Sequence, residues 1–231
     1  MSQVPPAKRH PYDQWSPDAR ALDLVGDKWT LLIIRDLISG PRRFVELQRV
    51  LPGISTEQLR SRLNRMVADG MLTRQRYREV PPRVDYELTE RARDLAPVLG
   101  ELARWGYEWA WGAPRPNEHV DVGAIFRLLP GLVRPGTVAS GSISLTAGNG
   151  DGGAHALLSI SPQSVTLAES AEPFTADASL SGAVDAWVRA LSPTADTSGL
   201  QGDGRADLRS AVLELLSLGH DAEERLAEAA S

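Results

Sequence analysis

Hydrogen-bonding and cationic side chains gather on one face of the segment 55–65. At about 100° per residue, Leu59, Leu63 and Met66 share one helical face, as packing on a core requires. Amides and hydroxyls on the opposite face can bond to base edges, and guanidinium groups can bind guanine or phosphate. The candidate nucleic-acid contacts of this segment are Ser55, Thr56, Gln58, Ser61, Arg62, Asn64 and Arg65. Arg60 flanks the same face, where a merely solvated charge is an equally good interpretation.

Local signals predict where this helix begins and ends. Ser55 is a favourable N-cap, and Gln58 lies three residues later, where its side chain can complete a capping box. Ile54 and Leu59 occupy the positions of a hydrophobic staple. Gly70 suits the position just beyond the helix end.

The segment after this helix has the pattern of a two-stranded ribbon. Leu72–Tyr77 and Val84–Leu88 alternate in the manner of strands around the turn 79–83. Arg78 and Arg83 flank the tip, where they could bind the DNA backbone or the adjacent minor groove. A capped helix followed by such a ribbon indicates a winged helix-turn-helix, whose partner is double-stranded DNA.

Three further helices are expected ahead of this one. The segments Asp13–Val25, Lys28–Ser39 and Phe44–Leu51 are amphipathic or apolar, and Pro52-Gly53 supplies the turn before the reading helix. Arg42 and Arg43 lie just ahead of the third segment. Cations gain nothing from a helix N-terminus, so we interpret both as facing phosphate, with solvated surface arginines as the alternative.

Composition excludes several classes of protein. The 231 residues include no cysteine, which excludes disulfides, thiolate zinc sites, iron–sulfur clusters and thiol redox sensing. The polar, proline-rich start and the lack of a long apolar run argue against a signal peptide and a membrane span. We therefore expect a soluble, cytoplasmic protein that does not bind membranes.

The charge is divided unevenly between the two halves of the chain. Residues 1–115 hold 19 Lys and Arg against 15 Asp and Glu, a net charge of +4. Residues 116–231 hold 6 against 15, a net charge of −9. Only the first half suits a polyanionic partner.

The first half resembles a known family of regulators. The segments 18–29, 37–44 and 51–55, and the wing with Tyr86-Glu87-Leu88-Thr89, look like HxlR-type winged helix-turn-helix regulators over about residues 14–111. The resemblance implies a homodimeric transcription factor that binds an inverted-repeat operator. Several members carry a Cys-Pro in the first helix, and some of them sense electrophiles or oxidants through it. Here that position is Ser16-Pro17, so thiol sensing does not carry over.

A long helix is predicted from the cap at Thr89 to about Trp111, with a broad apolar stripe. A lone domain is too small to bury this stripe, so we expect a second copy to cover it, as the family resemblance also implies. The alternative is that the stripe packs on the C-terminal half of the same chain. The candidate dimerisation residues are Trp15, Leu95, Leu99, Leu102, Trp105 and Trp109.

The second half reads as a separate α+β layer. Residues 112–117 form a stiff polar linker, which predicts a DNA-binding and dimerisation domain at 1–113 and a second domain at 119–231. The helical pattern Val122–Val133 is followed by strand-like runs, which predict an antiparallel sheet, and then by helical patterns. The strand-like runs are Val138–Thr146, Ala154–Ile160, Val165–Ala168 and Ala176–Leu180, and the later helical patterns are Gly182–Leu191 and Arg205 to about Leu218.

This half is similar to the sterol-carrier-protein fold over about residues 119–220. The resemblance is carried by 175–182, the following helix with Trp187, and Gly202-Asp203-Gly204-Arg205. It implies a cavity between sheet and helices for a hydrophobic or aromatic small-molecule effector, although each apolar residue taken alone reads as plain core. The candidate lining residues are Ile125, Phe126, Leu129, Phe174, Trp187 and Leu191.

No motif indicates catalysis, a metal or a cofactor. Residues 148–153 match G-x-G-x-x-G, but they lie between two strand-like runs and no helix follows to bind a pyrophosphate. His10, His119, His155 and His220 lack ligand spacing, and no nucleophile elbow is present. We therefore expect no enzyme.

Three functional hypotheses follow. The leading one is a dimeric, sequence-specific transcriptional regulator, expected to be a repressor, whose operator affinity responds to an apolar effector in the C-terminal half. The second keeps the DNA-binding regulator but makes its C-terminal half a structural or protein-interaction module without ligand. The third, an enzyme or lipid carrier with an incidental DNA-binding fold, leaves the basic first half unexplained.

Overall fold

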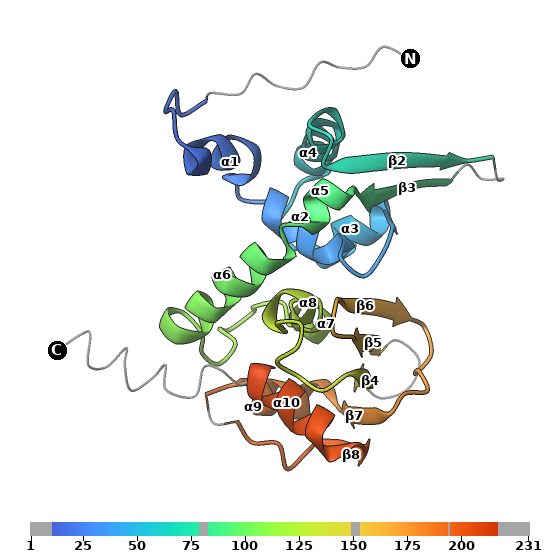
Figure 1. Ribbon diagram of the computed structural model, residues 1–231. Helices are drawn as coiled ribbons and strands as arrows, with labels where there is room; N and C mark the ends of the chain where they lie inside the picture. The colour runs from blue at the N-terminus through green and yellow to red at the C-terminus, as the bar shows by residue number, and fades with distance from the viewer. Residues whose placement is uncertain (1–10, 79–82, 149–152, 194, 217–231) are drawn as a thin grey trace. The chain divides into compact units, whose positions relative to one another are not determined.

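The computed structural model describes residues 11–78, 83–148, 153–193 and 195–216. The chain divides into two compact units, residues 1–95 and 96–231, each described by itself below (Figure 1). The sequence placed the division later, between residues 113 and 119. The predicted turn at 79–82, the centre of the loop 148–153, His10 and His220 lie outside the described residues.

The first unit is a helical core with a small antiparallel sheet. Its strand order is β1-β3-β2, and Arg42 pairs with Tyr86 while Leu72 pairs with Leu88. The described elements are α1 (Pro17–Val25), α2 (Thr30–Leu37), β1 (Arg42–Arg43), α3 (Phe44–Val50), α4 (Thr56–Ala68), β2 (Leu72–Tyr77), β3 (Arg83–Leu88) and α5 (Glu90–Arg93). The predicted helices and ribbon of this unit are therefore confirmed within a few residues.

Helix α2 supplies the centre of this core. Ile33, Ile34 and Leu37 are fully buried, together with Leu47 of α3. The predicted start of α1 is also confirmed, because Ser16 Oγ accepts a hydrogen bond from the Ala19 N–H and Pro17 is the first helical residue.

The single helix predicted from Thr89 to about Trp111 is wrong in one respect. The chain forms α5, which Thr89 caps, and then a separate helix, α6 (Ala96–Trp109). Pro97 explains the break, because its nitrogen carries no hydrogen to donate and its ring clashes with the carbonyl of Arg93 one turn earlier. Helix α6 belongs to the second unit.

The second unit is a five-stranded sheet with helices, so the predicted α+β class is confirmed. The strand order is β6-β5-β4-β7-β8. Its further elements are α7 (Val122–Phe126), α8 (Leu129–Leu132), β4 (Gly141–Ala147), β5 (Ala154–Ile160), β6 (Val165–Ser170), β7 (Ala178–Gly182), α9 (Val184–Leu191), β8 (Gln201–Gly204) and α10 (Ala206–Leu216).

Three details of this unit correct the sequence prediction. The sheet is mixed rather than antiparallel, because β7 runs parallel to β4 with Leu145 opposite Leu180. The predicted helix 122–133 is two short helices, since Pro130 cannot donate a backbone hydrogen bond back to Phe126. The segment 202–204 is part of the edge strand β8, not the start of a helix.

One face of this sheet forms the core of the second unit. Ile143, Leu145, Leu158 and Leu180 point into a cluster that also contains Trp187 of α9. The alternate residues of β4 lie on the other face of the sheet, since successive strand side chains alternate. No helix among the described residues is long and apolar enough to cross a membrane.

Candidate nucleic-acid interface

The capping box and the buried apolar face expected from the sequence both hold helix α4 in place. Ser55 Oγ accepts a hydrogen bond from the Gln58 N–H at 3.2 Å, and Gln58 Oε1 accepts one from the Ser55 N–H at 3.0 Å. Leu59, Leu63 and Met66 are buried, so the inner face is anchored in the core. The predicted capping box and core face are therefore confirmed.

The outer face of α4 presents uncharged hydrogen-bonding groups to the exterior. Ser61 and Asn64 are exposed and Arg65 is half-buried. Thr56 is exposed, but its Oγ1 accepts a hydrogen bond from Gln48 Nε2 of α3 at 2.8 Å, which ties the two helices together. Gln58 uses its carbonyl oxygen in the capping box, so its NH₂ group is the part left to donate outward. The chemistry of this face suits base edges.

Two arginines beside this face are engaged within the protein. Arg62 Nη1 lies 2.9 Å from Asp27 Oδ2, so the side chain predicted to contact DNA joins α4 to the segment before α2. Arg60 pairs with the exposed Glu57 at 2.9 Å and lies over the ring of Phe44.

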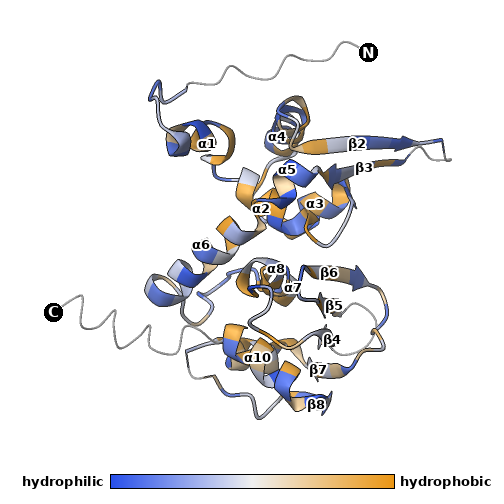
Figure 2. Cartoon of the chain, viewed as in Figure 1, coloured by the Kyte–Doolittle hydropathy of each residue, from blue (hydrophilic) through white to orange (hydrophobic). Residues whose placement is uncertain are grey.

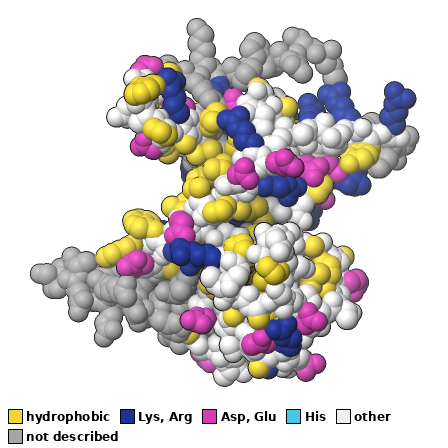
Figure 3. Space-filling model, in the orientation of Figure 1, with side chains coloured by type: hydrophobic (Ala, Val, Ile, Leu, Met, Phe, Trp, Pro, Cys, Tyr) yellow, Lys and Arg dark blue, Asp and Glu magenta, His cyan; other side chains and the backbone are white. Residues whose placement is uncertain are grey.

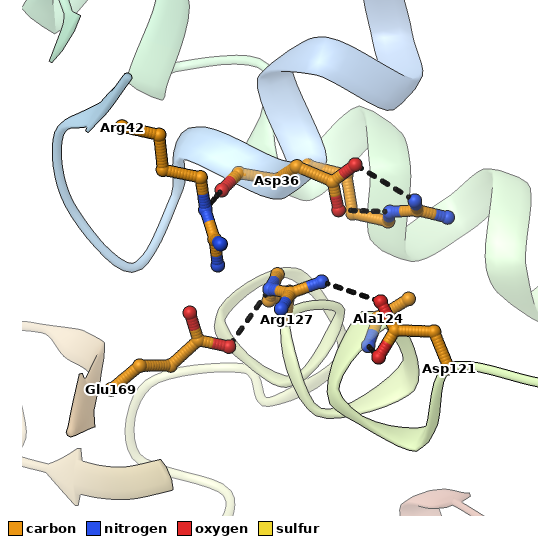
Figure 4. A network of polar contacts seen from close by, with 7 residues as sticks. Asp36, Arg42, Asp121, Ala124, Arg127 and Glu169 are labelled. Carbon is orange, nitrogen blue, oxygen red and sulfur yellow. Dashed lines mark hydrogen bonds and ion pairs between the residues drawn. The ribbon is translucent and has the colours of Figure 1, made fainter. Parts of the chain in front are cut away.

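The arginines ahead of α3 differ in exposure. Arg42 is half-buried, and its Nε donates to the Asp36 carbonyl at 2.5 Å (Figure 4). Arg43 is exposed, and its Nε lies 3.9 Å from Asp85 Oδ1. Arg43 is thus the better placed of the two for an external phosphate.

Asp85 organises the base of the wing. It is 2% exposed, and Arg83 donates to both of its carboxylate oxygens. The hydrogen bonds from Arg83 hold the pKa of Asp85 below its ordinary value of 3.8, with smaller contributions from the charges of Arg83 and Arg43. Arg83 also lies over the ring of Tyr77, 5.0 Å from its centroid, so this predicted DNA contact has a structural role.

The exposed cations of the wing lie on β2 instead. Arg74 and Arg76 point to the same side of this strand, and both are exposed, as is the predicted Arg78 just after it. Arg74 also lies over the ring of Tyr86, 5.9 Å from its centroid. Figure 2 shows that β2 is hydrophilic beyond its first residues, and Figure 3 shows cationic side chains over the wing. The sequence analysis missed Arg74 and Arg76, although their spacing of two within a predicted strand was a usable signal.

The apolar side chains predicted to form the dimer differ in exposure. Leu102, Trp105 and Trp109 lie along one line of α6 and are 50, 59 and 41% exposed, and Val98, which was not among the predicted residues, continues that line at 49%. Figure 3 shows hydrophobic side chains at the surface along α6. Leu99 is only 4% exposed, so it is already covered within the chain, and Leu95 is half-buried. In the first unit, Trp15 is 95% exposed.

The residues proposed for an effector pocket lie in or beside the core of the second unit. The rings of Phe126 and Trp187 meet edge to face with centroids 4.9 Å apart, and Trp187 Nε1 donates to the Thr146 carbonyl at 2.8 Å. Leu129 and Leu191 are buried beside them. Ile125 and Phe174 are half-buried, so these two form the outer part of the set.

A buried cation joins α7 to the edge of the sheet. Arg127 is 5% exposed, and it pairs with Asp121 at 3.2 Å and with Glu169 of β6 at 2.8 Å (Figure 4). Asp121 also caps α7 by accepting from the Ala124 N–H. Such a paired and hydrogen-bonded cation is the form in which a charge is tolerated in an interior.

Known proteins resemble the first unit together with α6. Residues 24–113 match the model of the HxlR-like helix-turn-helix family. The HTH-type transcriptional regulator sll1512 of Synechocystis is 41% identical over 93 residues, which cover 40% of this chain and 69% of that protein. YvaP of Bacillus subtilis, another HTH-type transcriptional regulator, is 37% identical over 90 residues, which cover 39% of this chain and 83% of that protein.

Solved structures of related proteins cover the same part of the chain. The reduced form of the transcriptional regulator YodB from B. subtilis is 34% identical, with a TM-score of 0.38, and the match covers 42% of this chain and 96% of that one. The family assignment rests on the sequence matches alone. The curated relatives named above are transcriptional regulators and not enzymes, in agreement with the predicted class. Through its N-terminal residues, this chain belongs to the HxlR-like helix-turn-helix family.

Proposed function

We propose that the chain is a DNA-binding transcriptional regulator that places α4 in the major groove of its operator. The observation that carries the proposal is the contrast between the two faces of this helix. One face is buried on Leu59 and Leu63, while the other presents Ser61 and Asn64 to the exterior. Ser61 can donate or accept a hydrogen bond, and Asn64 can bond to adenine in a bidentate manner.

The wing supplies contacts that do not depend on sequence. Arg74, Arg76 and Arg78 are exposed along one strand and its end, so they can neutralise backbone phosphates. Replacing Arg76 and Arg78 by alanine removes two such contacts. The slope of log affinity against log salt should then become less steep by about 2.

A dimer that reads an inverted repeat is the proposed assembly. The exposed line Val98, Leu102, Trp105 and Trp109 supports it, because four large apolar side chains in one helical stripe form a surface that a second helix can cover. Two reading helices about 34 Å apart would then enter successive major grooves on one side of the duplex. Repression is the proposed sign of regulation, since a dimer seated over a promoter blocks access to it.

Footprinting on the promoter beside the protein's own coding region tests this proposal. The full chain should protect a region with two-fold symmetry, and the variant Ser61→Ala/Asn64→Ala should lose the protection at concentrations where the wild type gives it. Gln163→Ala, an exposed neutral change in the second unit, is the matched control. A wild-type chain that protects no symmetric sequence on that promoter or on a random-sequence library overturns the proposal.

For the second unit we propose a sterol-carrier-like domain that modulates operator affinity by holding an apolar or aromatic small molecule. The α+β layers and the aromatic centre of Phe126 and Trp187 support it, and the lack of cysteine excludes the thiol alternative. Such an effector acts by binding more tightly to one arrangement of the two α4 helices in the dimer. A coupling free energy of about 1–3 kcal/mol between effector and operator changes the operator affinity about 5- to 150-fold.

A structural module without ligand is the second candidate for this unit. The observation that favours it is that Phe126, Leu129 and Trp187 are fully buried against their own neighbours. Native mass spectrometry of the purified chain distinguishes the two. A co-purifying apolar compound supports the effector, whereas a ligand-free spectrum together with an unchanged melting temperature in saturating indole supports the module.

A further inference from the structure

The buried carboxylate of Asp85 lies between two arginines on one face of the small sheet in the first unit. Arg83 lies two residues earlier on β3, and Arg43 of β1 stands directly opposite Asp85 in the strand register. Side chains two apart on a strand, and directly opposed side chains on neighbouring strands, point to the same face of a sheet. The pairing of β1 with β3 therefore brings Arg43, which is distant in the sequence, to the same carboxylate as Arg83.

The two arginines interact with this carboxylate in different ways. Arg83 Nε donates to both oxygens of Asp85, at 2.9 Å from each. Arg43 Nε lies 3.9 Å from Asp85 Oδ1, which is beyond the range of a hydrogen bond. Asp85 therefore receives its hydrogen bonds from Arg83 and attracts Arg43 only through its charge.

The Arg43 guanidinium keeps all of its hydrogen-bond donors. It donates to no residue within the described ranges 11–78, 83–148, 153–193 and 195–216, and 49% of its side chain is exposed. The backbone at this position is fixed, because the Arg43 N–H donates to Glu46 Oε2 at 2.7 Å. A guanidinium presents five N–H groups in a planar fork that fits pairs of phosphate oxygens. Arg43 is thus oriented by one charge and open to an external acceptor.

Contacts inside the first unit place Arg43 close to α4. The ring of Phe44, the next residue, lies 5.9 Å from the guanidinium carbon of Arg60 on α4. Gln48 of α3 donates to Thr56 in the first turn of α4. The helix that follows Arg43 is therefore attached to the helix that the proposed function places in the major groove. Backbone phosphates are the anions that flank this groove.

We infer that Asp85 is a positioning residue that holds Arg43 in the orientation in which Arg43 binds a DNA backbone phosphate. The inference rests on the proposed function, DNA binding by the first unit. Arg83 supplies the hydrogen bonds that a buried carboxylate needs, so Arg43 keeps its donors for the DNA. Ordering a long side chain only at the moment of binding weakens affinity about two- to tenfold, and a side chain ordered beforehand avoids this loss.

The positioning role and simple charge repulsion predict opposite effects when Asp85 is neutralised. A carboxylate near DNA repels phosphates, so its removal alone should strengthen binding. If Asp85 positions Arg43, its removal should weaken binding instead, because Arg43 is then ordered only when the DNA arrives. The sign of the change in affinity therefore separates the two roles.

Three full-length variants are titrated onto a duplex of mixed sequence, because phosphate contacts carry no sequence information. Asp85→Asn should weaken binding about threefold, and Arg43→Ala about tenfold. Glu87→Gln is the matched control, since Glu87 lies on the same face of β3 and pairs with Arg93 at 3.3 Å rather than with Arg43. This variant should leave the affinity unchanged or raise it by up to about twofold.

A double variant shows whether Asp85 acts through Arg43. Arg43→Ala/Asp85→Asn should bind within about twofold of Arg43→Ala, because no arginine is left at position 43 to be held. Tighter binding by Asp85→Asn than by the wild type overturns the inference. A further threefold loss in the double variant relative to Arg43→Ala overturns it as well, since Asp85 would then act independently of Arg43.

A measurement on the wild type decides the question if Asp85→Asn does not fold. Nuclear magnetic resonance relaxation of the arginine Nε–H groups in the DNA-free chain should show Arg43 more ordered than Arg76, which is also exposed and pairs with no carboxylate among the described residues. Equal disorder of the two side chains overturns the inference. A wild-type chain that binds no duplex rejects the proposed function itself, which distinguishes that failure before any variant is made.

Discussion

The two units of this chain use their polar side chains in opposite ways. In the first unit the outer face of α4 and the strand β2 leave Ser61, Asn64 and Arg76 exposed. In the second unit the prominent cation is turned inward, since Arg127 is buried between Asp121 and Glu169. The indole N–H of Trp187 likewise donates a hydrogen bond inside the unit, to the Thr146 carbonyl.

This difference explains why one unit is easier to interpret than the other. A surface that binds an external polymer has to leave its hydrogen-bonding groups uncommitted, so residue types and spacing already indicate the partner. A unit whose polar groups bond to each other indicates stability and shape but not a ligand. The net charges of +4 and −9 for the two halves of the sequence follow the same division.

The largest expected effect concerns the core of the second unit. Trp187→Ala removes a fully buried ring and its hydrogen bond to Thr146, and it should lower the free energy of unfolding of the second unit by about 3–5 kcal/mol. Val184→Ala, at a 43% exposed position on the same helix, is the control and should change little. Calorimetry of the full chain checks both. Equal melting for the two variants would mean that the core of this unit is not where the structure places it.

The next-largest effect concerns the outer face of α4 in the first unit. Ser61→Ala/Asn64→Ala shortens two exposed side chains on the outer face of α4, so stability should be unchanged. Affinity for the operator should fall by about 2 kcal/mol, roughly 30-fold, while binding to unrelated duplexes stays the same. Fluorescence anisotropy on both duplexes is the measurement. A parallel loss on the two duplexes would assign these residues to phosphate contact rather than to base reading.

A smaller effect is expected at the start of the reading helix. Ser55→Ala removes the acceptor for the Gln58 N–H and should destabilise the first unit by about 1 kcal/mol. Ser55→Gly should lower the stability of the first unit by only about 0.3 kcal/mol, because glycine is also tolerated as an N-cap. Chemical denaturation followed by circular dichroism ranks the two. The reverse ranking would contradict the cap assigned to α4.

The smallest effect is a pH dependence in the wing. The pKa of Asp85 is held below 3.8 in the folded chain, chiefly by the hydrogen bonds from Arg83. This contribution to stability is therefore fully present above pH 3.8 and is lost as the pH falls through the lowered pKa. Because the Arg83 side chain is 37% exposed, solvent screening keeps this contribution to about 0.5 kcal/mol. The stability difference between wild type and Asp85→Asn should shrink over that acid range, and a difference independent of pH would exclude the pair as its source.

Local signals in the sequence predicted the elements that depend on neighbours along the chain. Ser55 and Gln58 predicted the cap of α4, and the alternation in 72–77 predicted β2. Pro97 and Pro130 carried an equally local signal, so the breaks they cause after α5 and α7 could have been predicted from the chemistry of proline.

Features set by distant neighbours could not be predicted in the same way. The Gly-rich strand β8 has no strand propensity of its own and exists because β7 lies beside it, with Gly202 opposite Leu180. Nothing near Arg62 in sequence shows that Asp27 engages its charge. Asp85, by contrast, lies two residues after Arg83 on the same predicted ribbon, so that pair carried a local signal that the sequence prediction missed. The candidate interface is therefore shifted toward Asn64, Arg74 and Arg76 relative to the sequence prediction.

The contrast between the two units depends on whether two copies of the first unit bind DNA together as a dimer. The most direct measurement is a titration of the full chain onto an inverted-repeat duplex and onto a duplex with one half-site scrambled, with the mass of each complex determined by light scattering. The account predicts two chains on the intact repeat and a loss of at least about tenfold in affinity on the scrambled duplex. One chain per duplex, with equal affinity for both, would contradict it.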